Sequence, residues 1–149
     1  MSFREKSAWV CFFVTIAAFV PYFFYIFGLF DRRALTTASV ITAIAAVVIF
    51  QVILQVAAQI VIGLQTKQEA KDERDVVIES RSIRNAYYVL TSSCIIAFAC
   101  IVVLSTSPVE SELYHLFGPA FTSQVFLLCF VLAEMTKYLT RAVSYRRGY

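Results

Sequence analysis

The chain has few of the residue types that build metal, haem or phosphate sites. Its 149 residues include one histidine and four glycines. Metal and haem sites usually combine several His or Cys ligands from different elements, and phosphate-binding loops need closely spaced glycines. The sequence therefore predicts no metal site and no cofactor, and the single histidine, His115, is expected to be solvated.

Cysteine is also scarce where thiol chemistry would need it. Cys11, Cys94, Cys100 and Cys129 all lie within apolar runs, whereas disulfides form in segments exposed to an oxidising compartment. We interpret these cysteines as small buried hydrophobic residues. The chain also lacks the Gly-x-Ser-x-Gly and His-Glu-x-x-His motifs, which mark serine and zinc hydrolases. The sequence therefore predicts a protein that is not an enzyme.

Charged residues are also few: they make up 15% of the chain, whereas hydrophobic residues make up 60%. The charges cluster between long apolar runs, a pattern typical of membrane proteins. About 20 helical residues cross a hydrocarbon layer of roughly 30 Å. Four runs reach that length, so the predicted fold class is all-α, with transmembrane helices over residues 8–30, 35–64, 86–106 and 120–139.

The basic residues predict the orientation of these helices. If both termini are cytosolic, eleven of the thirteen Lys and Arg residues lie on the cytosolic side, and only Arg32 and Arg33 lie outside. Cytosolic loops carry such an excess of basic residues, so the chain is predicted to form two in-out-in hairpins. Because the basic residues flank membrane ends and alternate with acids, they favour the lipid bilayer as a partner over nucleic acid.

Two segments outside the apolar runs have helical patterns of their own. On the outer side, Ser107, Pro108 and Glu110 form a capping box, which predicts a short interfacial helix over residues 108–117. On the cytosolic side, residues 67–85 form an amphipathic segment in which Val76 and Ile83 are seven residues apart. This spacing continues into the third apolar run, so we expect one unbroken helix that starts near residue 72.

The cytosolic segment also carries a motif. Asp72-Glu73-Arg74-Asp75, followed by Ile78, Arg81, Arg84 and Ala86-Tyr87, resembles the D-E-R-D…I…A-Y signature of small, uncharacterised four-helix membrane proteins of bacteria. The resemblance implies a bacterial inner membrane and a constrained cytosolic segment, and it implies no activity. The predicted docking residues are Asp72, Glu73, Arg74, Asp75, Arg81, Ile83, Arg84 and Tyr87. The alternative is a solvated helix that only caps the membrane domain.

Polar side chains interrupt two of the apolar runs. Gln51, Gln55 and Gln59 recur every four residues and span only about 80° of a helix. A buried amide without a hydrogen bond costs several kcal/mol, so these amides are expected to bond to neighbouring helices. In the fourth run, Glu134 is an ionisable group within the membrane, where such groups are functional candidates. The alternative for Glu134 is an ion pair with Lys137.

These features lead to two functional hypotheses. The first is a non-enzymatic membrane protein that acts by association, either by self-assembly into a homo-oligomer or by holding a membrane or cytosolic protein partner through residues 71–90. The second is a small oligomeric transporter or channel, in which Gln51, Gln55, Gln59 and Glu134 line a polar path.

Overall fold

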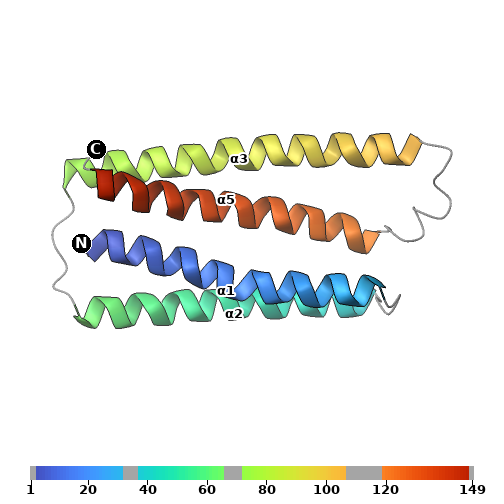
Figure 1. Ribbon diagram of the computed structural model, residues 1–149, viewed down its shortest axis with the longest axis horizontal. Helices are drawn as coiled ribbons and strands as arrows, with labels where there is room; N and C mark the ends of the chain where they lie inside the picture. The colour runs from blue at the N-terminus through green and yellow to red at the C-terminus, as the bar shows by residue number, and fades with distance from the viewer. Residues whose placement is uncertain (1–2, 32–36, 66–71, 107–118, 148–149) are drawn as a thin grey trace.

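The computed structural model describes residues 3–31, 37–65, 72–106 and 119–147 (Figure 1). These residues form four long helices: α1 (Phe3–Asp31), α2 (Thr37–Gln65), α3 (Glu73–Thr106) and α5 (Pro119–Arg147). The predicted all-α class is thus confirmed for the described part of the chain. The predicted interfacial helix over 108–117, His115 within it, and residues 67–71 of the cytosolic segment lie outside the described residues.

The predicted transmembrane runs 8–30, 86–106 and 120–139 each fall within one of these helices. The run 35–64 coincides with α2 from residue 37 onward, and its first two residues lie outside the described part of the chain. Three of the helices, α1, α2 and α3, contain a segment that is long and apolar enough to cross a membrane. This result supports the assignment of the chain to the membrane class. The fourth helix, α5, has the same length as α1 and α2, 29 residues.

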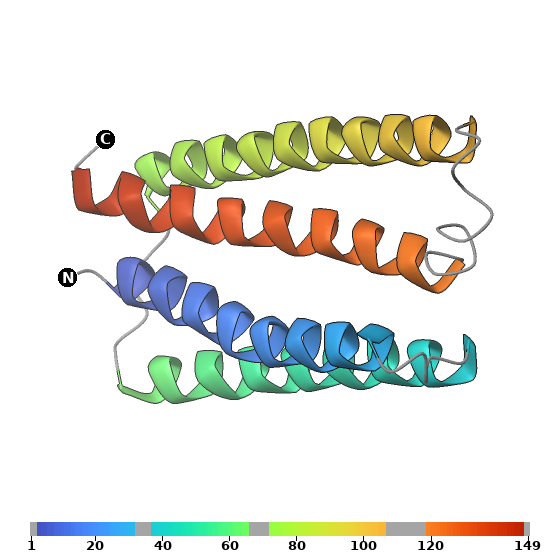
Figure 2. The same cartoon turned by 45° about the vertical axis from the view of Figure 1, so that its right-hand side comes forward.

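The helices are arranged side by side in the order α2, α1, α5, α3 (Figures 1 and 2). α1 packs against α2 and α5, while α3 packs against α5. The outer helix α3 is therefore the least enclosed of the three membrane candidates. Only 6% of its most apolar segment is buried within the chain, compared with 33% of the corresponding segment of α1.

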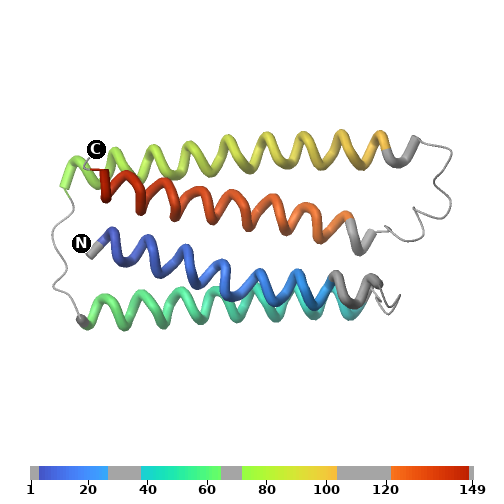
Figure 3. Tube along the Cα trace, viewed as in Figure 1, coloured from blue at the N-terminus to red at the C-terminus, as the bar shows by residue number. Residues whose placement is uncertain are grey.

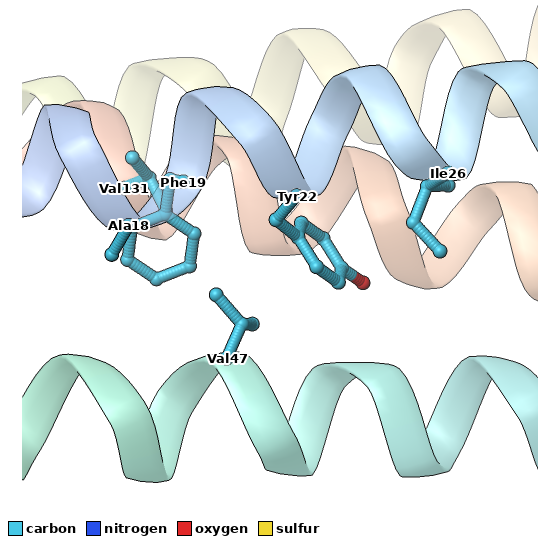
Figure 4. Close-up of a cluster of buried hydrophobic side chains, with 6 residues drawn as sticks. All are labelled: Ala18, Phe19, Tyr22, Ile26, Val47 and Val131. Carbon is cyan, nitrogen blue, oxygen red and sulfur yellow. The ribbon is translucent and has the colours of Figure 1, made fainter.

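The hydrophobic core lies among α1, α2 and α5 (Figure 4). Bilayer lipid is as apolar as a leucine side chain, so membrane helices associate through close packing and polar contacts instead of water exclusion. α1 also changes direction near its middle (Figure 3), and it contains Pro21, which removes one backbone hydrogen bond and bends a helix. The core side chains are Ala18, Phe19, Tyr22 and Ile26 of α1, Val47 of α2 and Val131 of α5.

Most of the side chains buried on α3, which packs against α5, are small. Ser82 and Ala97 of α3 are buried, as are Cys129, Ala133 and Ala142 of α5. Small residues let two membrane helices approach closely, which explains how α3 packs on α5 without contributing to the main core. The predicted burial of the cysteines within the chain is confirmed for Cys129 and for Cys11 of α1, whereas Cys94 is half-buried and Cys100 is exposed on α3.

α3 is the longest helix and runs without a break from Glu73 to Thr106. The predicted continuous helix starting near residue 72 is therefore confirmed. At 1.5 Å per residue, its 34 residues extend over about 51 Å, which is longer than a hydrocarbon layer of roughly 30 Å.

Candidate functional site

Each glutamine of the stripe on α2 contacts another helix. The Gln51 Nε2 atom donates to Thr15 Oγ1 of α1 at 2.9 Å. The Gln55 Nε2 atom donates to the Tyr138 hydroxyl of α5 at 3.2 Å. The Gln59 Nε2 atom lies 3.4 Å from Cys11 Sγ of α1. The amides therefore join α2 to both of its neighbouring helices, as the interhelical interpretation of the stripe requires.

Burial changes along this stripe. Gln51 is 8% exposed, Gln55 is half-buried and Gln59 is exposed. The buried Thr15 hydroxyl donates to the Cys11 carbonyl at 2.9 Å, which leaves its oxygen able to accept from Gln51. The Gln51 Oε1 atom is buried without a hydrogen-bond partner among the described residues. Each glutamine of the stripe thus makes one interhelical contact, and the contact of Gln51 is the most buried of the three.

A further interhelical hydrogen bond, which the sequence did not predict, joins α1 to α5. The Tyr22 hydroxyl of α1 donates to Gln124 Oε1 of α5 at 2.8 Å, and both side chains are buried. The available signal was a tyrosine in the first apolar run and a glutamine in the fourth. The sequence gives no way to pair them, because the contact depends on how α1 and α5 are rotated toward each other.

Glu134 lies on α5, one helical turn from the tyrosine that Gln55 contacts. Lys137 Nζ binds both carboxylate oxygens of Glu134, at 3.1 and 3.2 Å, so the predicted ion pair is present. Both side chains are about one-third exposed. Tyr138 also has Glu134 as an electrostatic neighbour. Of the four predicted intramembrane residues, Gln55 and Glu134 thus meet at one tyrosine, while Gln51 and Gln59 contact α1.

The D-E-R-D motif begins α3. The Glu73 backbone N–H donates to Asp72 Oδ1 at 2.7 Å, and the Asp72 backbone N–H donates to Asp75 Oδ2 at 3.0 Å. These bonds satisfy backbone donors that a helix N-terminus leaves without partners. The carboxylates also complement the positive end of the helix dipole. The two aspartates therefore stabilise the start of the helix.

Asp75 also joins the ends of three helices. Its Oδ2 atom lies 2.9 Å from a guanidinium nitrogen of Arg4 on α1, and its Oδ1 atom accepts from the Tyr145 hydroxyl of α5 at 2.9 Å. Partial burial alone would raise the pKa of Asp75, but the hydrogen bonds from Asp72 and Tyr145 and the charge of Arg4 lower it below its usual value. The carboxylate of Asp75 thus fixes the end of the molecule where α1 begins and α5 ends.

The remaining docking candidates are exposed on α3. At this end of α3, Ile78 and Ser82 are buried within the chain, whereas Ile83 and Tyr87 are 54% and 63% exposed. The structure therefore divides the predicted docking set. Asp75 is half-buried and joins three helix ends. The exposed members are Asp72, Glu73, Arg74, Arg81, Ile83, Arg84 and Tyr87.

Among the described residues, no three His, Cys, Asp or Glu side chains are grouped as a metal site requires. The polar groups described above contact one another through hydrogen bonds and ion pairs, which hold helices in place. No protein-family model, curated protein or solved structure matches the chain.

The bond between Gln55 and Tyr138 can be measured by a double-mutant cycle. Gln55→Leu and Tyr138→Phe should each destabilise the folded protein in detergent, and the double variant should lose less than the sum. Interhelical hydrogen bonds in membranes contribute roughly 0.6 to 2 kcal/mol, so we expect a coupling energy of about 1 kcal/mol. Gln55→Leu combined with Tyr22→Phe serves as the control, since Tyr22 contacts Gln124. Equal coupling in both cycles would contradict the assigned bond.

The contacts of Asp75 predict a stability that depends on pH. Because the pKa of Asp75 is lowered in the folded protein, its contribution is present at neutral pH and is lost as the pH falls through that lowered pKa. Asp75→Asn should therefore cost about 1 kcal/mol near pH 7 and should cost much less under acid conditions. Unfolding would be followed in detergent at both pH values. A cost for Asp75→Asn that does not change with pH would contradict this role.

Proposed function

We propose that this chain is a non-enzymatic integral membrane protein of a bacterial inner membrane and that it acts by association with another protein chain. In this proposal the chain crosses the bilayer four times as two hairpins, with both termini and residues 67–85 in the cytosol. The three apolar helices and the excess of basic residues near one set of helix ends support this topology.

The geometry of Asp75 is consistent with the proposed orientation. Arg4 near the start of α1 and Tyr145 near the end of α5 both contact it, so these two ends lie together with the start of α3. If that end is cytosolic, about 20 Å of α3, from Glu73 to residue 85, extends beyond the membrane run that starts at residue 86. The exposed surface of this extension would then face water instead of lipid.

The observation that carries the proposal is the exposure of large apolar side chains on this extension. Val76 is 52% exposed and Ile83 is 54% exposed, and both lie on a segment that also exposes Glu73, Arg81 and Arg84. Exposed apolar side chains farther along α3 would be covered by lipid, whereas those among charged residues outside the bilayer would not. Exposed apolar patches rimmed by polar residues mark protein or membrane interaction sites, and the proposed position of this patch outside the bilayer favours a protein.

The polar contacts between and within the helices also support a role in association. All three glutamines of α2 contact α1 or α5, and Glu134 is paired with Lys137. Groups engaged in this way stabilise the arrangement of the helices. They support a membrane domain that serves as a rigid platform for the cytosolic part of α3.

One observation favours the alternative of a small oligomeric transporter or channel. Tyr138 contacts Gln55 and lies beside Glu134, which places a hydroxyl between an amide and an ionisable group. Such a sequence of polar groups is the kind that proton pathways use. For a path to form, Glu134 would have to exchange its ion pair with Lys137 for contact with a transported ion, and further copies of the chain would have to line the path.

The association proposal is tested by placing a charge in the exposed apolar surface. Ile83→Asp should reduce crosslinking of the chain to any protein in native membranes roughly tenfold, because a carboxylate would be desolvated in the interface. Val77→Asp is the matched control, since Val77 is similarly exposed at 61% but lies about 120° away around the helix. Both variants should insert to the same level. Equal crosslinking by both variants would contradict the proposal.

A further inference from the structure

We propose that the partner is a second copy of this chain, and that the cytosolic parts of the two α3 helices pack against each other in parallel. This inference rests on the proposed association function and identifies its partner. The inference is based on a second stripe of residues on α3, which is distinct from the surface that contacts α5. We call it the outer stripe, and it consists of Glu73, Val76, Ser80, Ile83 and Tyr87, all exposed.

The outer stripe has the spacing of a coiled-coil seam. Its members follow one another at intervals of three, four, three and four residues, which is the a/d pattern of two helices that supercoil around each other. The surface facing α5 contains Ile78 and Ser82 instead. At 100° per residue, the centres of the two surfaces are roughly 160° apart. A helix can therefore pack on the outer stripe without displacing α5.

The charges beside the outer stripe match a parallel pair of helices. With Val76 and Ile83 at d positions, Glu79 occupies a g position and Arg84 the following e position. In a parallel coiled coil, a g residue of one helix faces the e residue five positions later on its partner. Glu79 of each copy would thus face Arg84 of the other, and a two-fold symmetric dimer contains this pair twice.

The membrane favours the same geometry. Two copies inserted in the same orientation present their α3 helices in the same direction, so a two-fold axis along the membrane normal makes the helices parallel. The outer stripe spans 15 residues from Glu73 to Tyr87, or two heptads, which is short for helices that meet in free solution. Anchoring both copies in one bilayer raises their effective concentration, so a short seam is sufficient.

A cysteine crosslinking pair tests the seam directly. Ser80→Cys places a thiol at an a position, close to the two-fold axis, and Arg81→Cys places one on the adjacent, also exposed residue about 100° away. A short bis-maleimide applied to native membranes should link Ser80→Cys chains into homodimers at least several-fold more than Arg81→Cys chains. The four native cysteines are present in both variants, so their background is matched. Equal dimer yields from the two variants would overturn the inference.

Charge exchange tests the register. Arg84→Glu should weaken dimer formation roughly tenfold, because two attractive pairs become repulsive, and Glu79→Arg in the same chain should restore it. Failure of the second change to restore the dimer would overturn the parallel register. A photo-crosslinker at residue 80 that captures a different protein, with no homodimer, would overturn the second-copy inference while leaving the association function intact. Absence of any product at residue 80 would contradict both.

Discussion

The structure depends on a constraint that lipid imposes on side-chain amides. An amide in hydrocarbon has no water to bond, so each one must find its partner on another helix or be left unsatisfied at a high free-energy cost. Gln51 and Gln59 find theirs on α1, Gln55 finds its partner on α5, and Gln124 of α5 accepts from α1. These bonds specify how α1, α2 and α5 are rotated about their axes, which packing of uniform apolar surfaces would leave undetermined.

α3 is positioned by different interactions. Small buried residues allow it to approach α5 closely, and Asp75 joins its start to Arg4 and Tyr145. Neither interaction occupies the outer stripe. The aspartates of the motif thus hold the start of the helix in position, while Ile83, Arg84 and Tyr87 are exposed on the other side of α3. This arrangement, with one surface of α3 bound and another exposed, is the basis of the proposed association with a second chain.

Much of the fold was predictable from the sequence, whereas the pairing within the site was not. Hydropathy runs defined the four helices, and the seven-residue spacing through Val76 and Ile83 predicted that α3 continues past the charged segment without a break. The glutamine spacing showed that the three amides share one face. It did not identify Thr15 or Tyr138 as partners, because a single sequence does not fix the rotation of neighbouring helices. The role of Asp75 was missed for a related reason, since it requires three distant helix ends to meet.

The central claim is that the polar groups of α1, α2 and α5 hold these helices together instead of lining a path. Ion flux through the purified protein in liposomes tests this claim most directly. With Glu134 paired to Lys137 and the glutamines bonded across helices, an imposed proton gradient should decay no faster than in liposomes without protein, for the parent chain and for Glu134→Gln alike. Sustained proton flux through the parent chain that is abolished by Glu134→Gln would contradict the account.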